Sequence, residues 1–216
     1  MNLFVIGDVH GCYYTFEKMI NTYWNREEEL LIQVGDLIDR GNYSPETVAF
    51  ARTLQEKYPN QVIFLKGNHE YEIILHFVDM FNKHWYRQCG EVTLNQYKRV
   101  NRSPEKDVNW FESLPLIWEN DRVYVSHAGI AKNAIDPFNE ENPLGVLWNR
   151  EPLKNINKLQ IHGHTPLDEP TFDAESNTWN IDTGAAFSGY LTGVKINENG
   201  EVKGFYNIKT DSRDKR

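Results

Sequence analysis

The sequence predicts a single α/β domain whose functional groups gather at one edge of its β-structure. Apolar runs typical of buried strands alternate with helical patterns, at about the 30-residue spacing of a βαβ unit. Five of the predicted strands end with a polar side chain at or just beyond a glycine. The 216 residues are 40% hydrophobic and 25% charged, an ordinary composition for one globular domain.

The first third of the chain predicts three strands joined by two helices. Strands are expected over residues 3–8, 29–36 and 61–68, and helices over 13–25 and 44–58. Parallel strands need crossover connections of this kind, so the order favours a parallel sheet.

The middle of the chain has a different pattern. Residues 69–121 are polar, aromatic and mainly helical in periodicity, with Pro104 and Pro115 as breaks. We expect this helical segment to lie beside or over the site.

Strands return in the last part of the chain. They are expected over 122–129, 158–164 and 178–184, followed by a hairpin over 192–208 that turns at Asn199-Gly200. The segments between them, 145–151 and 166–178, are predicted as loops. We assign residues 1–208 to one domain and residues 209–216 to a charged tail that we expect to fray.

The charge balance excludes several classes of partner. A formal net charge of -8 gives no free attraction to nucleic acid or an anionic membrane, so phosphate binding would need a bound cation. Nothing approaches the ~18 apolar residues of a membrane span, and the N-terminus lacks the basic region of a signal peptide. Cys12 and Cys89 form no disulfide framework or metal-binding pattern. We therefore expect a cytoplasmic protein with no membrane contact and no stable nucleic-acid partner.

The polar residues at the strand ends predict a metal site. Ligands of open α/β sheets bind outside the carboxyl ends of the strands, so these side chains should share one edge. The candidate ligands are Asp8, His10, Asp36, Asn68, His127 and His164. Such a mixed oxygen and nitrogen set without thiolate suits Mn, Fe, Zn or Co better than Ca. Six ligands are too many for one tetrahedral ion but fit two ions bridged by a carboxylate, an arrangement that serves phosphoester hydrolysis.

Four more charged or titratable residues suit the same chemistry. Arg40 and Arg150 are candidate phosphate clamps, because a guanidinium binds phosphate with a planar fork. His69 is a candidate general acid, and Asp39 would hold its ring in the productive tautomer. A water shared by two ions would lose a proton near neutral pH and attack phosphorus.

Five ordered motifs carry a family resemblance: GDVHG (7–11), GDLIDRG (35–41), GNHE (67–70), HAG (127–129) and GHT (163–165). Together they resemble the signature of the calcineurin-like metallophosphoesterases. The DRG triplet places the chain nearer the phosphoprotein phosphatase branch. HGCY (10–13), WNRE (148–151) and IDTGAAFSGYLT (181–192) also resemble the small bacteriophage-lambda-type serine/threonine phosphatases.

The resemblance implies two mixed β-sheets packed as a sandwich, flanked by helices, with a dinuclear site at the carboxyl ends of the strands. It implies Asp8 and His10 on the first ion, Asp36 as the bridge, Asn68, His127 and His164 on the second ion, Arg40 and Arg150 on phosphate, and His69 with Asp39 as the acid pair. Manganese is the expected metal, with Fe, Zn, Co and Ni as alternatives. One position departs from many relatives outside the protein-phosphatase branch, where a second histidine stands in place of Pro166.

Each of these residues also has a simpler structural interpretation. Asn68 could cap the helix that starts near Glu70. Asp39 and Arg40 could form a structural ion pair, and Arg150 could lie on the surface. The co-occurrence of five motifs in order favours the functional interpretation. His162, two residues before the histidine of GHT, is predicted to support a metal ligand from behind or to pack, and not to bind metal itself.

The predicted activity is hydrolysis of phosphomonoesters by a serine/threonine protein phosphatase with broad phosphomonoesterase activity, acting on phosphorylated proteins or small phosphoesters. The alternative enzyme is a hydrolase of a dinucleotide polyphosphate, such as diadenosine tetraphosphate, or of an RNA 5′ end. The DRG triplet, which begins with Asp39, favours the protein phosphatase, although some asymmetrical tetraphosphatases keep this aspartate. A third possibility is a non-catalytic metal-binding interaction module, but such a protein would be expected to lose His69, Asp39 or a ligand.

Overall fold

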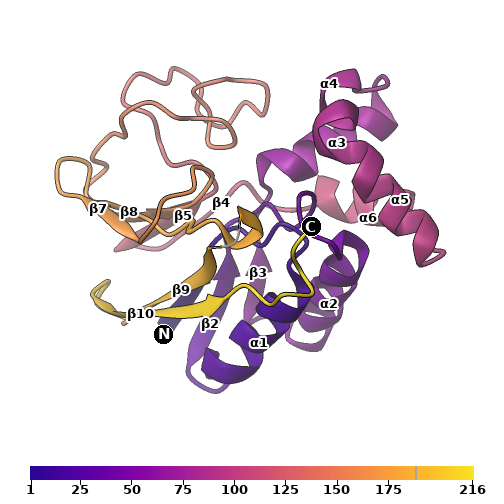
Figure 1. Cartoon of the computed structure of the whole chain (residues 1–216). Helices are drawn as coiled ribbons and strands as arrows, with labels where there is room; N and C mark the ends of the chain where they lie inside the picture. Colours follow the sequence, from indigo (N-terminus) through magenta and orange to yellow (C-terminus); the bar gives the residue numbers. More distant parts are fainter. Residues whose placement is uncertain (188) are drawn as a thin grey trace.

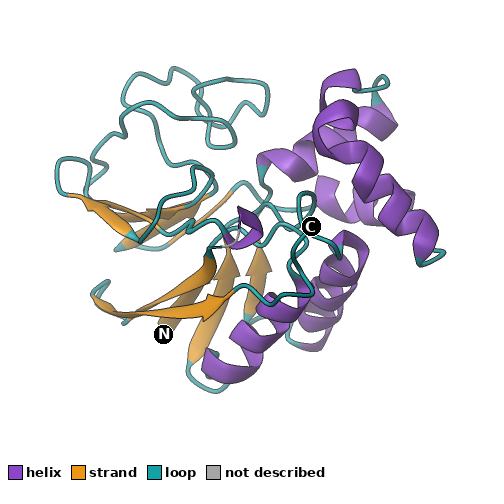
Figure 2. Ribbon diagram, in the orientation of Figure 1, coloured by secondary structure: helices purple, strands orange, loops and turns teal. Residues whose placement is uncertain are grey.

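The computed structural model describes residues 1–187 and 189–216, which form two five-stranded β-sheets with helices on the outer side of the first sheet (Figure 1 and Figure 2). The first sheet has the strand order β10-β9-β1-β2-β3. Its strands are β1 (Asn2–Ile6), β2 (Glu29–Gln33), β3 (Val62–Phe64), β9 (Tyr190–Ile196) and β10 (Val202–Lys209). The first three are parallel, and β9 and β10 extend them as the predicted antiparallel hairpin.

Helices α1 (Tyr13–Tyr23) and α2 (Ser44–Lys57) connect the parallel strands and cover the outer face of this sheet. Alternation along β1 separates the two faces, because successive side chains of a strand point in opposite directions. Phe4 and Ile6 belong to the cluster shared with the helices, and Leu3 and Val5 belong to the cluster between the two sheets.

The second sheet has the strand order β4-β5-β6-β8-β7. Its strands are β4 (Ile117–Glu119), β5 (Val123–Ser126), β6 (Leu159–His162), β7 (Thr171–Asp173) and β8 (Thr178–Asn180). The central three are parallel, and the two edge strands are antiparallel. Val125 and Ile161 of this sheet pack against the inner face of the first sheet. The predicted sandwich of two mixed sheets flanked by helices is therefore confirmed.

Two short strands were not predicted. Strand β4 lies within the segment 69–121 that was expected to be mainly helical, and β7 lies within the predicted loop 166–178. Each has three residues, which is too short to show a period, and all three residues of β7 are exposed. Each pairs antiparallel with the last strand on its side of the parallel core, β4 with β5 and β7 with β8.

The helical segment follows β3 and lies beyond the carboxyl ends of the parallel strands (Figure 1). It contains α3 (Asn68–Val78), α4 (Lys83–Trp85), a π-helical turn (Tyr86–Gly90), α5 (Glu91–Arg99) and α6 (Glu105–Glu112). Helix α3 packs on α6, and α5 packs on α2. Among the described residues, no helix is both long and apolar enough to cross a membrane.

The end of the chain is packed, where the sequence suggested fraying. The Asp214 side chain is fully buried, and its carboxylate accepts bonds from the Tyr14 and Thr15 amides and from the Thr15 hydroxyl. These amides belong to the first turn of α1, whose N–H groups have no partner within the helix. Asn42 also donates its backbone N–H to the Asp214 carbonyl, so the tail joins the start of α1 to the loop that carries Arg40.

Candidate metal centre

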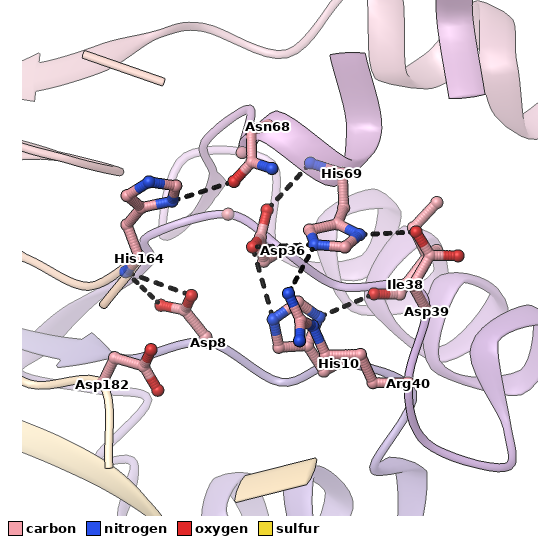
Figure 3. Close-up of polar contacts among 12 residues, drawn as sticks. Asp8, His10, Asp36, Ile38, Asp39, Arg40, Asn68, His69, His164 and Asp182 are labelled. Carbon is pink, nitrogen blue, oxygen red and sulfur yellow. Dashed lines mark hydrogen bonds and ion pairs between the residues drawn. The ribbon is translucent and has the colours of Figure 1, made fainter. Parts of the chain in front are cut away.

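The predicted site residues meet at one edge of the sandwich, where strands of both sheets end (Figure 3). They are Asp8 and His10 after β1, Asp36 after β2, Asn68 and His69 after β3, His127 after β5 and His164 after β6. Most of these side chains are at least nine-tenths buried. The structure therefore brings every proposed ligand into one cluster.

Asp36 lies in the middle of this cluster. One carboxylate oxygen, Oδ2, is 3.4 Å from His10 Nε2, and the other, Oδ1, is 3.5 Å from His127 Nε2. Its two oxygens thus face two different groups of candidate ligands. This is the geometry expected of a carboxylate that bridges two ions.

The second group of ligand atoms converges closely. His127 Nε2, His164 Nδ1 and Asn68 Oδ1 lie 2.9 to 3.0 Å from one another. Atoms that bind one ion octahedrally at about 2.1 Å are separated by about 3 Å, so the spacing fits an ion at their centre. Asn68 is the first residue of α3 and not its cap, because Gly67 occupies the cap position. The Asn68 oxygen is therefore free to face the histidines.

The histidines are held neutral, as metal ligands must be. Burial lowers the pKa of His127 to about 3 and that of His164 to about 2. Burial also holds the pKa of His10 well below its usual range. The Nδ1 atoms of His10 and His127 lie 2.9 Å and 3.2 Å from the carbonyl oxygens of Ile38 and Val34, so each ring donates there and turns the lone pair of Nε2 toward Asp36.

Three buried carboxylates lie close together on the other side of the cluster. Burial, followed by the negative charges of Asp182 and Asp36, raises the pKa of Asp8 well above its usual range. A divalent ion would relieve this repulsion, so the cluster fits a metal site. Asp182 lies beside Asp8 in Figure 3 and was not predicted as a site residue. The same signal, an acidic residue near a glycine after a strand, could have identified it.

The loops that carry the ligands adopt an unusual backbone. Five site residues have positive φ angles: His10, Asp36, Asp39, Arg40 and His164. Left-handed conformations are unfavourable for residues with a Cβ atom and persist only where surrounding contacts fix them. Here the buried Glu70 carboxylate accepts backbone N–H bonds from Asp36, Leu37 and Gly67 at 2.8 to 2.9 Å. Glu70 is the last residue of the GNHE motif, and this role was not predicted from the sequence.

His69 and Asp39 form the predicted pair. His69 Nδ1 lies 2.5 Å from an Asp39 oxygen, and the opposite ring nitrogen lies 3.9 Å from Asp36. Burial alone would lower the pKa of His69, but the two carboxylates outweigh it and raise the pKa to about 9. The Asp39 carboxylate, fully buried, also accepts bonds from Trp85 Nε1 (2.7 Å) and Thr93 Oγ1 (2.5 Å). These two residues carry no motif, and the sequence offered no signal for them.

Both arginines reach the mouth of the cluster. Arg40 Nη2 lies 3.2 Å from His69 Nε2, and the exposed Arg150 donates to Thr165 Oγ1 at 3.1 Å. They line a hollow of about 340 Å³ whose other lining residues include Asn68, His69, Trp148 and His164. An anion that enters this hollow would meet both guanidinium groups. His162 lines a separate groove with Pro152 and Asn180.

The same arrangement connects the chain to known proteins. Residues 1–194 match the calcineurin-like phosphoesterase family. The chain is 29% identical to a bis(5'-nucleosyl)-tetraphosphatase PrpE [asymmetrical] of Geobacillus sp., over 92% of this chain and 91% of the relative. It is 29% identical to the protein of the same name from Bacillus cereus, over 90% of both chains. A solved protein serine/threonine phosphatase from Saccharomyces cerevisiae shares the fold, with a TM-score of 0.66 and 17% identity over 98% of this chain and 81% of that one.

Proposed function

We propose a substrate and a mechanism for this chain, which belongs to the calcineurin-like phosphoesterase family and is a metallophosphoesterase. The proposed reaction is asymmetrical hydrolysis of a dinucleoside tetraphosphate. The observation that carries it is the name shared by the relatives from Geobacillus and Bacillus cereus, which align with nine-tenths of this chain. This reverses the order of the two enzyme interpretations drawn from the sequence, because the DRG triplet alone favoured a protein phosphatase.

The proposed metal ligands fall into two groups around Asp36. The groups are Asp8 and His10 on one side and Asn68, His127 and His164 on the other. Members of this family use divalent metals, which when bound would neutralise phosphate charge and lower the pKa of a water. Asp36, with one oxygen toward each group, would fix the spacing between the two positions.

The remaining residues act directly on the phosphate chain. Arg40 and Arg150 would bind non-bridging oxygens, where planar guanidinium groups also orient the phosphorus for attack. His69 would carry a proton on Nε2, the nitrogen that faces the hollow, and give it to the departing oxygen. Asp39 would hold the ring in place by accepting the hydrogen bond that His69 Nδ1–H donates.

A second candidate, hydrolysis of phosphomonoesters including phosphoserine, is supported by the acid pair itself. An alkoxide is a poor leaving group and needs a proton, whereas a nucleoside polyphosphate leaves readily without one. The Asp39 carboxylate is held by Trp85 and Thr93 in addition to His69. Because Asp39 is fixed in this way, it can hold His69 firmly as the proton donor. A firmly held proton donor helps most when the leaving group is poor.

Product analysis separates the candidates. We expect kcat/KM for diadenosine tetraphosphate, measured with Mn, to exceed that for a phosphoserine peptide by about tenfold or more, with AMP and ATP as the products. The Asp36→Asn variant, purified in parallel, controls for contaminating phosphatases. A higher kcat/KM for the peptide would support the second candidate, and two ADP molecules would contradict the asymmetrical split. Turnover of neither substrate would favour the non-catalytic module.

A further inference from the structure

A second groove adjoins the metal centre and has no role in the reaction described above. It has a volume of about 720 Å³ and is bounded by the loop after β6, the short helix η2 (Ala185–Phe187) and the end of β10. The described residues that line it include Pro166, Leu167, Phe187, Tyr190, Asn207 and Lys209. Because η2 and the loop after β6 both follow strands that carry site residues, these walls of the groove lie at the same edge of the sandwich as the metal centre.

Phe187 joins this groove to the phosphate clamp. Its side chain is 55% exposed, which is high for so large an apolar ring. The Arg40 guanidinium lies 4.9 Å from the centre of the ring, and the same guanidinium lies 3.2 Å from His69. Leu167, on another wall of the groove, is also exposed at 37%. The exposed apolar surface of the groove is therefore directly beside Arg40, the proposed phosphate contact.

The groove also has polar lining residues. Asn207 Oδ1 accepts a bond from Thr192 Oγ1 at 2.9 Å, which fixes the amide and leaves its N–H₂ group to act as a donor. Lys209 and Asp168 line it too, and within residues 1–187 and 189–216 no carboxylate pairs with the Lys209 ammonium group. The groove therefore offers an aromatic face, a hydrogen-bond donor and the ammonium group of Lys209, and the Arg40 guanidinium lies beside its aromatic wall.

From this arrangement we infer that the groove binds the nucleobase of a nucleotide whose phosphate is held by Arg40, with the base stacked against Phe187. The inference rests on the proposed function, since it names the part of the molecule that a dinucleotide substrate adds to a phosphate. A nucleobase is flat and apolar on its faces, carries acceptors on its edge and is tethered to anions. The flat apolar face matches the Phe187 ring, and the acceptors on the base edge match the Asn207 amide. The attached anions match Arg40 and Lys209.

The test isolates the base from the phosphate. AMP and ribose 5-phosphate share the sugar phosphate and differ only by adenine, so the ratio of their competition constants against p-nitrophenyl phosphate reports binding of the base. We expect AMP to compete about 10-fold or more tightly than ribose 5-phosphate, as base stacking on an aromatic side chain predicts. Phe187→Ala should bring the ratio near one and leave the ribose 5-phosphate constant unchanged. Phe172→Ala, which removes an exposed ring outside the groove, is the matched control.

Other outcomes are equally distinct. A wild-type ratio near one, or an unchanged ratio in Phe187→Ala, overturns the inference. If that variant weakens both competitors equally, Phe187 only positions Arg40 and the inference also fails. Phe187→Leu keeps the apolar bulk without the aromatic face and serves if the alanine variant is unstable. Turnover of diadenosine tetraphosphate by the wild-type protein, measured separately, tests the proposed function, so either idea can fail while the other stands.

Discussion

Replacing Thr93 by valine tests whether the helical segment controls His69, the proposed catalytic acid. The change keeps the shape of the side chain and removes one hydroxyl donor from the Asp39 carboxylate, which is fully buried. A hydrogen bond to a charged group contributes about 1.5–3 kcal/mol to stability. For a domain of this size about 1 kcal/mol corresponds to about 2–4 °C, so the thermal midpoint should fall by roughly 3–12 °C.

The same variant should alter catalysis selectively. With one donor fewer, Asp39 is less well stabilised as an anion and orients His69 less firmly. Hydrolysis of a phosphoserine peptide, which needs the proton, should slow more than hydrolysis of p-nitrophenyl phosphate, whose leaving group does not. The measurements are thermal unfolding and kcat/KM for both substrates.

Thr47→Val is the matched control for this prediction. Thr47 is also fully buried, but its hydroxyl donates to the neutral carbonyl of Tyr43 at 2.8 Å. Its loss should cost only about 0.5–1.5 kcal/mol and should affect the two substrates equally. If Thr93→Val were as stable as Thr47→Val and slowed both substrates alike, Thr93 would have no special connection to the acid.

Three further predictions concern the ligands and the clamp. Asp36→Asn should reduce the Mn content of the purified protein from the proposed two ions to fewer than one, because the amide loses the negative charge and keeps only one of the two oxygens that face the ligand groups. Retention of two ions at wild-type affinity would exclude a bridge. Arg40→Ala or Arg150→Ala should lower kcat/KM by about 10²-fold with metal content intact, and lysine should restore little of it. Unchanged kinetics would show that the arginine concerned does not bind the phosphate. Gly163→Ala should weaken Mn binding, measured by calorimetry, because its new Cβ would collide with the Asp8 carboxylate.

The sequence predicted which polar residues gather at one edge, because their positions depend on topology. Parallel strands place their carboxyl ends on one edge, so a polar residue near a glycine after each strand is enough to predict a shared site. The neighbours of Asp39 could not be predicted in this way. Trp85 and Thr93 lie 46 and 54 residues further along the chain, in a segment without motifs, and reach Asp39 only through the packing of helices.

The packed end of the chain shows the same limit. Residues 209–216 are charged, which predicts exposure, but Asp214 is an acceptor that the unpaired amides at the start of α1 require. Composition cannot distinguish a charged residue that faces water from one that caps a helix 199 residues away in sequence. Contacts of this range depend on the completed fold.

Glu70 connects the strain of the site to its stability. Left-handed backbone costs about 1–2 kcal/mol for each residue with a Cβ atom, and five site residues adopt it. The loop after β2 is held in this shape by the Glu70 carboxylate, which accepts the backbone N–H groups of Asp36 and Leu37 and also that of Gly67 at the start of α3. One buried side chain therefore fixes the loop that presents Asp36 and the helix that presents Asn68. Protein contacts therefore fix the position of Asp36 relative to Asn68, which is the kind of preorganisation that electrostatic catalysis uses.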